Sequence, residues 1–430
     1  MNSPAAISAV HNLENVLFFT LLQIAIIIVI ARLAGNLSRR MGQPRAVGEI
    51  IAGLLLGPSL LGSLAPETFQ FIFHSVDAMP LTVMSQIGLI LLMFQVGMDF
   101  DFSHLTEQRN RVAVLAVSVA GITVPFALGF IFGQLSAQSL APEINPLTYS
   151  LFIATAFSIT AVPILGRIMN EFGLNRTQLG AITISSAAIN DVVGWTLLAA
   201  ISTVVMANFS LLGIAQQVGA ILLYLFCCWL IVKMLKRHLI SRYDLSRGLP
   251  RDLMAILLIM VFVSAMVTNQ IGIFAIFGGF VMGVLFHSNT ELVAAWKEKV
   301  SDLVMVFFLP IFFTYSGLRT DILGLDSWEL WIWCGAALIL ATVGKFGGCY
   351  WGGRFAGLNR YEARSIAIMM NTRALMGLIV LNVGHDLGVI SQNVFTMMVL
   401  MAIFTTIITA PCLRLWLPRA GHIIPQGRDG

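Results

Sequence analysis

Residues 178–206 read QLGAITISSAAINDVVGWTLLAAISTVVM, a run in which Asp191 is the one charged side chain. The run exceeds the roughly 20 predominantly apolar residues that an α-helix needs to cross a bilayer. It therefore predicts a transmembrane helix with a carboxyl group close to its middle.

The rest of the chain has the same apolar character. Of its 430 residues, 58% are hydrophobic and 11% are charged, whereas a soluble domain carries about 25% charged residues. This composition excludes a disordered chain, a coiled coil and a nucleic-acid-binding domain. The cysteines lie in apolar runs without metal-ligand spacing, so we interpret them as small hydrophobic residues; they are Cys227, Cys228, Cys334, Cys349 and Cys412. We predict an all-α polytopic membrane protein that needs no cofactor.

Long apolar runs between helix-breaking residues predict about thirteen spans. One span plus a short loop, repeated thirteen times, uses the whole chain, so we expect a single membrane domain and no C-terminal regulatory domain. The N-terminus lacks the basic segment and cleavage site of a signal peptide, so the first span should be retained. The spans lie near residues 15–33, 47–62, 80–98, 112–133, 147–169, 178–206, 210–233, 252–269, 271–287, 301–317, 328–353, 363–384 and 391–415.

The basic residues predict the orientation of these spans. Of the 25 Lys and Arg residues, all except Arg319, Lys345 and Arg373 fall on one side of a thirteen-span arrangement. Because cytoplasmic loops are rich in Lys and Arg, this places the N-terminus outside and the C-terminus in the cytoplasm. Arg319 falls on the opposite side, in a loop that also carries Asp321 and Asp326. The net charge of +4 then reflects topology rather than a polyanionic partner.

Two glycine motifs recur at matching positions. GLLLG (53–57) in the second span resembles GFVMG (279–283) in the ninth, and Gly97 near the end of the third span corresponds to Gly317 near the end of the tenth. Seven spans separate the members of each pair, so the two halves would have opposite topology, as in many secondary transporters. Alternatively, the glycines only allow close helix packing.

Asp191 is the strongest candidate for chemistry. A carboxylate at the bilayer centre costs about 2.5–3.5 kcal/mol on insertion scales, and such residues mark ion and proton pathways. Burial favours the protonated carboxyl group, so a proton and a monovalent cation can compete for it. The alternative is an aspartate that hydrogen-bonds to a neighbouring helix and serves packing.

The fifth span contains SITAVP (158–163). Pro163 lacks an N–H group and clashes with the carbonyl four residues earlier, at Ile159, so the helix is expected to unwind here. Freed carbonyls and the hydroxyls of Ser158 and Thr160 are then candidate cation ligands. An ordinary proline kink is the alternative.

Two basic residues lie inside spans. Lys345 stands in GKFGG (344–348) and Arg373 in NTR (371–373). A buried lysine needs a carboxylate or polar partner, and an arginine cannot lose its proton, so each has to pair or face water. A structural ion pair is the alternative to a transport role for both. Glu49 begins the second span and is a weaker candidate.

Together these segments resemble the monovalent cation/proton antiporter family 2, which includes sodium/proton antiporters, Kef-type proteins and plant cation/proton exchangers. The resemblance rests on Asn190-Asp191, on the Ser158–Pro163 run, on Lys345 and on Asn371-Thr372-Arg373, which is followed by LIVLNVG (378–384) as in the plant branch. It covers roughly residues 15–417.

This resemblance implies a homodimer in which two crossed, partly unwound helices, the fifth and twelfth spans, meet beside the acidic residue. It implies a panel for dimerisation (15–98 and 252–317), a mobile core (112–206 and 328–415) and a linker helix (210–233). It also implies inverted repeats and an elevator-like movement of the core. Electrogenic members have two adjacent aspartates, but this sequence has Asn190 in the first position, which favours electroneutral exchange.

We therefore predict an antiporter of the cell (inner) membrane that exchanges Na+ or K+ for H+. Asp191 would bind the cation transiently, assisted by Asn190, Ser158 and Thr160, while Lys345 and Arg373 would stabilise the site by their charge. A sodium-coupled symporter of an organic anion is the alternative. An intramembrane enzyme is disfavoured because the sequence has neither a second mid-membrane aspartate nor an HExxH helix. The sequence leaves the transported ion, the stoichiometry and the pH set-point open.

Overall fold

The computed structural model describes residues 4–98, 108–174, 177–206, 211–238 and 248–422. Across these ranges the chain is helical and forms no strand, which confirms the predicted all-α class. The helices are α1 (Pro4–Arg40), α2 (Arg45–Leu55), α3 (Pro66–Phe73), α4 (Met79–Met98), α5 (Gln108–Leu140), α6 (Pro146–Ser158), α7 (Val162–Glu171), α8 (Gln178–Met206), α9 (Leu211–His238), α10 (Arg251–Ile271), α11 (Ala275–Phe286), α12 (Thr290–Trp296), α13 (Leu309–Leu318), α14 (Trp328–Phe355), α15 (Arg360–Met370), α16 (Ala374–Asp386), α17 (Gln392–Ile407) and α18 (Thr409–Trp416).

The predicted number of thirteen spans is not confirmed. Among the described residues, nine helical segments are long and apolar enough to cross a membrane, or ten if the bent pair that contains α12 and α13 is one span. The helices α2 and α11 have 11 and 12 residues, which at 1.5 Å per residue gives about 17 and 18 Å. The hydrocarbon core is about 30 Å thick. Within the described residues every predicted range consists mainly of helix, but the count of thirteen stays a prediction.

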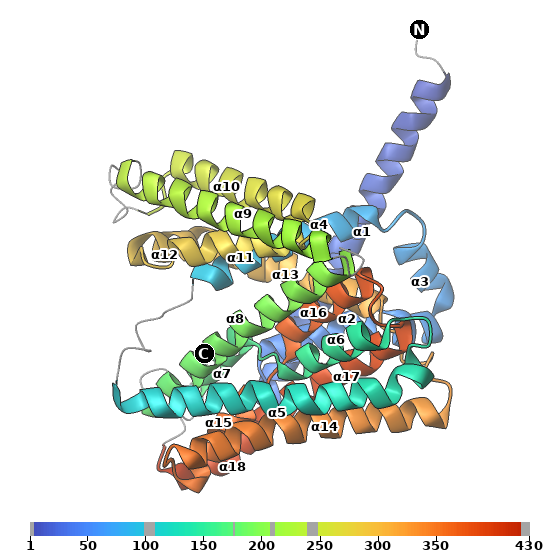
Figure 1. Cartoon of the computed structure of the whole chain (residues 1–430). Helices are drawn as coiled ribbons and strands as arrows, with labels where there is room; N and C mark the ends of the chain where they lie inside the picture. Colours follow the sequence, from blue (N-terminus) through green and yellow to red (C-terminus); the bar gives the residue numbers. More distant parts are fainter. Residues whose placement is uncertain (1–3, 99–107, 175–176, 207–210, 239–247, 423–430) are drawn as a thin grey trace.

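Contacts divide the helices into two bundles. In the first bundle, α5–α8 and α14–α18, α5 packs along α6, α8 and α14. In the second bundle, α1–α4 and α10–α13, α2 packs on α1 and α13, and α4 packs on α11. Figure 1 shows α5 and α14 side by side at one edge of the molecule, with α9 and α10 at the opposite edge. The helix α9 contacts α8 of the first bundle and α10 and α11 of the second. The roles of these bundles as mobile core and panel remain predictions.

The glycine motifs bring main chains of the second bundle into direct contact. A methyl group on Gly317 of α13 would collide with the carbonyl oxygen of Gly53 on α2. In the same way, a methyl group on Gly283 of α11 would collide with the carbonyl oxygen of Phe94 on α4, close to Gly97. The second predicted span therefore packs on the tenth, and the ninth packs on the third, so each half makes the equivalent contact with the other. This shared packing supports the inverted repeat, and it also shows that the glycines allow close approach.

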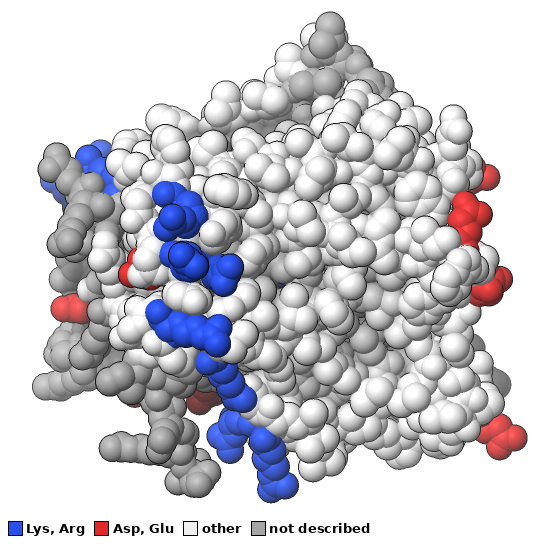
Figure 2. Space-filling model, turned by 90° about the horizontal axis from the view of Figure 1, so that it is seen from below, with Lys and Arg blue, Asp and Glu red and all other residues white. Residues whose placement is uncertain are grey.

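Charged residues separate toward two ends of the molecule. The helix α14 carries Glu329 in its first turn and Arg354 in its last turn. Arg360 of α15 and Arg414 of α18 lie at the same end of the molecule as Arg354. Figure 2 shows the basic side chains of the face in view gathered toward one end, which also carries some acidic side chains, whereas at the opposite end the coloured side chains in view are acidic. We call these the basic end and the acidic end. This separation matches the predicted charge asymmetry of the loops.

The glycine contacts predict a steric test. Replacing Gly317 or Gly283 by leucine should lower the free energy of unfolding by about 1–3 kcal/mol or more, because the added side chain has to push two main chains apart. The measurement is thermal melting of the detergent-solubilised protein. Gly335→Leu is the matched control, since nothing lies within 4 Å of a Cβ at that glycine of α14. Equal melting of all three variants would contradict the assignment.

Candidate functional site

The fifth predicted span is interrupted where proline chemistry requires it. The helix α6 ends at Ser158, residues 159–161 are not helical, and α7 begins at Val162, immediately before Pro163. Ile159 has an extended conformation, with φ −71° and ψ 147°. The missing N–H group of Pro163 and its clash with the Ile159 carbonyl account for this break.

The twelfth predicted span is also interrupted, although it contains no proline, and the two breaks touch. Between α15 and α16, residues 371–373 leave the helix. The main-chain N–H of Ala161 donates to the carbonyl of Thr372 at 2.8 Å. The Thr160 hydroxyl donates to the carbonyl of Met370 at 3.0 Å. The two predicted unwound helices therefore cross at these residues.

Two buried cations lie at the C-terminal end of α6. The Arg373 guanidinium donates to the Phe157 carbonyl at 2.7 Å and to the Ala341 carbonyl at 2.9 Å. The Lys345 ammonium donates to the Ser158 carbonyl. Carbonyls at a helix C-terminus lack intrahelical partners and carry the negative end of the helix dipole, so cations are favourable here. Arg373 and Lys345 thus stabilise the interruption.

All three donors of the Lys345 ammonium are satisfied by neutral oxygens. Besides Ser158, Nζ donates to the Gly121 carbonyl of α5 at 2.9 Å. With its amide oriented to satisfy its neighbours, Asn190 of α8 accepts from Nζ at 2.9 Å and donates to the Ser186 carbonyl at 3.2 Å. Because an ammonium has three N–H donors, this geometry leaves none for a carboxylate.

Asp191 is buried without a hydrogen-bond partner. Its exposed fraction is 1%, and neither carboxylate oxygen has a partner among the described residues. A buried carboxylate in this state carries a large desolvation cost unless it is protonated or binds a cation. The described residues contain no group of three His, Cys, Asp or Glu side chains that fits a metal ion.

The predicted site residues lie in one region of the structure, but their hydrogen bonds differ. Ser158 donates its hydroxyl proton to the carbonyls of Ala154 at 2.8 Å and Ile122 at 3.2 Å, and Thr160 donates to Met370. Both hydroxyl oxygens keep lone pairs for a cation. The amide of Asn190, in contrast, is already held by Lys345 and Ser186. A role of Asn190 as a cation ligand would require it to leave Lys345.

Sequence reasoning missed the acceptors that hold the two cations. Gly121 is the clearest case, and the sequence contains a signal for it, because Pro125 stands four residues later in α5. Proline lacks the N–H group that would bond the carbonyl four residues earlier, so the Gly121 carbonyl is free for Lys345. The backbone also needs glycine here, since a Cβ on Gly121 would lie 2.6 Å from the Cys349 sulfur. The carbonyls of Phe157 and Ala341 gave no signal, because every residue has one.

Comparisons with known proteins agree with this geometry. Residues 25–417 match the family described as sodium/hydrogen exchanger, transmembrane. The chain is 40% identical over 410 residues to the Na(+)/H(+) antiporter NhaS4 of Synechocystis, covering 95% of this chain and 99% of that protein. It is 34% identical to Cation/H(+) antiporter 17 of Arabidopsis thaliana over 93% of this chain, and it spans about half the length of that plant relative, 48%.

A solved structure shows the same fold. The sodium proton antiporter MjNhaP1 of Methanocaldococcus jannaschii superposes with a TM-score of 0.62 at 15% identity, over 94% of this chain and 98% of that one. The family match and the relatives confirm the resemblance noted in the sequence, and this superposition confirms the predicted antiporter fold. On the match over residues 25–417 and the identity to NhaS4, this chain belongs to the transmembrane sodium/hydrogen exchanger family.

Proposed function

We propose that this protein is a secondary antiporter that exchanges a monovalent cation, Na+ or K+, for protons, with Asp191 as the shared binding group. The observation that carries this proposal is the buried Asp191 carboxylate without a partner, beside a lysine whose donors are all engaged by neutral oxygens. A proton or a cation each neutralises that carboxylate. The names of the relatives, an Na(+)/H(+) antiporter and a cation/H(+) antiporter, support the same assignment.

Obligatory exchange follows from the cost of an empty site. An ionised Asp191 that moves across the membrane without a ligand carries an uncompensated charge in a low-dielectric environment. The loaded forms, protonated or cation-bound, are neutral and avoid this cost. The carboxylate therefore crosses in one direction with a cation and in the other with a proton.

One proton for one cation is the stoichiometry that this site favours. Asn190 is not titratable, and the Lys345 ammonium is bonded to three neutral acceptors rather than to Asp191. Asp191 is then the one group of the site that changes protonation during the cycle, and the exchange is electroneutral. The symporter alternative needs free cationic donors for an organic anion, and the donors of Lys345 are engaged.

The arrangement of the bundles supports an elevator-type movement. Every group that forms the crossing and its cations belongs to the first bundle, from α5, α6, α8 and α14–α17. That bundle can carry the intact site while the second bundle stays fixed, with α9 as the linker. We place the basic end in the cytoplasm of a cell membrane by the positive-inside rule, and we expect the second bundle to form a homodimer.

Removing the acid tests the central assignment. Asp191→Asn should abolish cation-driven proton flux, with at least a 100-fold loss, because an amide neither releases a proton nor neutralises a cation. The measurement is the response of a pH-sensitive dye in proteoliposomes after pulses of Na+, K+ or Li+. Asp326→Asn, at an exposed aspartate of the acidic end, is the matched control and should retain wild-type flux. Cation-driven flux in Asp191→Asn would refute the assignment.

Lys345→Met tests whether the lysine stabilises the crossing. The variant leaves the acceptors at Gly121, Ser158 and Asn190 without their shared donor, at a cost of about 1–3 kcal/mol for each buried group left unpaired. We expect a clearly lower melting temperature. Lys233→Met, at an exposed lysine of α9, is the control and should melt like the wild type. Unchanged melting of Lys345→Met would show that these hydrogen bonds contribute little.

Electroneutral exchange predicts the absence of a voltage signal. In proteoliposomes with a voltage-sensitive dye, a cation pulse that drives proton efflux should produce no change in membrane potential. A cation-dependent potential that disappears in Asp191→Asn would instead show that a second group, with Lys345 the first candidate, exchanges charge during the cycle.

A further inference from the structure

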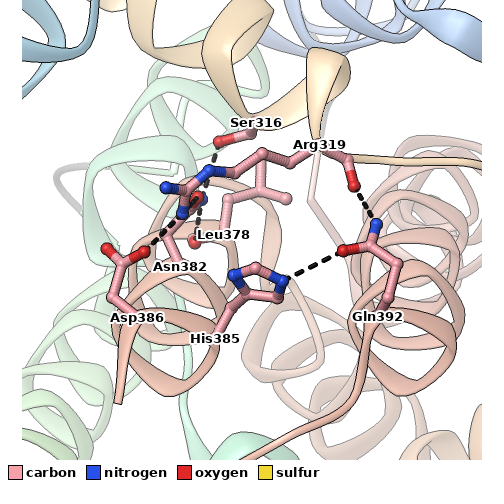
Figure 3. A network of polar contacts seen from close by, with 7 residues as sticks. All are labelled: Ser316, Arg319, Leu378, Asn382, His385, Asp386 and Gln392. Carbon is pink, nitrogen blue, oxygen red and sulfur yellow. Dashed lines mark hydrogen bonds and ion pairs between the residues drawn. The ribbon is translucent and has the colours of Figure 1, made fainter. Parts of the chain in front are cut away.

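Arg319 is the basic residue that the positive-inside count places on the wrong side. It follows the C-terminus of α13 at the acidic end, where the connection to α14 also carries Asp321 and Asp326. Its side chain is not directed at the cation site. Figure 3 shows it extended from the end of α13 toward Asn382 and Asp386 of α16.

The main chain around Arg319 is attached to the second bundle. The Ser59 hydroxyl, after α2, donates to the Thr320 carbonyl at 3.0 Å and accepts from the N–H of Ile322 at 2.8 Å. The guanidinium lies 4.4 Å from the centre of the Tyr315 ring of α13. Together with the contact between Gly317 and Gly53, these interactions attach the main chain of Arg319 to the second bundle. The Arg319 side chain therefore extends from a fixed position.

The partners of this segment come from the first bundle. The Arg319 guanidinium bonds the Asp386 carboxylate at 2.6 Å and the Asn382 amide oxygen at 3.3 Å, both on α16. Asn382 is buried, with an exposed fraction of 3%, and its amide nitrogen donates to the Ser316 hydroxyl of α13 at 2.8 Å. From α17, the Gln392 amide nitrogen donates to the Arg319 carbonyl, and its amide oxygen accepts from His385 Nε2 at 3.0 Å. The network thus joins α13 to α16 and α17 (Figure 3).

We propose that Ser316, Arg319, Asn382, Asp386 and Gln392 form a latch that holds the two bundles together at the acidic end and keeps that end closed. Arg319 is then a positioning residue, which sets how the transporter divides between its acidic-end-open and basic-end-open states. This inference rests on the elevator movement of the proposed function. The Arg319 latch also explains why a basic residue is present at the acidic end.

The strength of the latch suits a contact that breaks in every transport cycle. The side chains of Arg319 and Asp386 are 27% and 30% exposed, so water screens their attraction. The bundles are also joined at the basic end, where Gln43 donates to the Ile407 carbonyl at 3.1 Å and Arg414 to the Gly42 carbonyl at 2.9 Å. Those two bonds end on neutral carbonyls. The latch differs from them in pairing opposite charges across the bundles.

The test compares cation affinity from the two ends in right-side-out and everted membrane vesicles. Arg319→Gln and Asp386→Asn should each lower the apparent KM for the cation at the acidic end about three- to tenfold and raise it at the basic end, because the population shifts toward the open acidic end. The double variant should match the single ones, since both remove the same interaction. Arg319→Lys, which keeps the charge, should lie between Arg319→Gln and wild type. Asp326→Asn, which removes a charge from the same end, should leave both KM values unchanged.

A transport-independent measurement keeps the latch separate from the proposed function. In either variant, amide hydrogen exchange should accelerate on both sides of the contact, in residues 316–322 and 382–392. If the wild type shows Asp191-dependent flux but the variants shift neither the ratio of KM values nor exchange across the contact, the latch is refuted and the antiporter stands. If the wild type shows no cation-driven flux, the proposed function fails, and exchange confined to the mutated segment would refute the latch as well.

Discussion

The crossing of two interrupted helices is the constraint on which the rest of this structure depends. An interrupted helix in a membrane exposes carbonyl groups that no water can reach, and each costs free energy until it is bonded. Here the end of α6 is stabilised by two cations, Arg373 and Lys345, and by direct bonds between the breaks at Thr160, Ala161 and Thr372. The other features of the site follow from these hydrogen bonds.

The same hydrogen bonds explain why the acid has no hydrogen-bond partner. A lysine next to an aspartate in a low-dielectric interior would normally pair with it, and a permanent ion pair would compete with any transported cation. The carbonyls of Gly121 and Ser158 and the amide of Asn190 occupy the lysine instead. The Asp191 carboxylate is left without a hydrogen-bond partner, which is unfavourable for the fold but is what the proposed exchange of H+ for a metal cation requires.

The two bundles have packing suited to different tasks. In the second bundle, glycines bring main chains together at Gly53 and Gly317 and again at Gly97 and Gly283, which leaves little freedom for sliding. Between the bundles, the described polar contacts are few and lie near the ends, as at Gln43, Arg319 and Arg414. In the proposed elevator movement, contacts of this kind would break and re-form while the crossing moves as one body.

Sequence reasoning was sufficient for the class of protein, the helical ranges, the charge asymmetry, the interruption before Pro163 and the isolated acid at Asp191. These properties follow from side-chain polarity, from proline chemistry and from the spacing of residues along a helix, all of which are local. The interruption at residues 371–373 has no proline and was expected only from the resemblance to the antiporter family. The count of spans, by contrast, depends on the length of short helices such as α2 and α11, which composition does not define. The pairing of Arg319 with Asp386 joins residues far apart in the chain. The acceptors of Lys345 and Arg373 are mostly main-chain carbonyls, a group that every residue has. Which carbonyls face a cation depends on where the helices break and cross, so tertiary structure alone decided it.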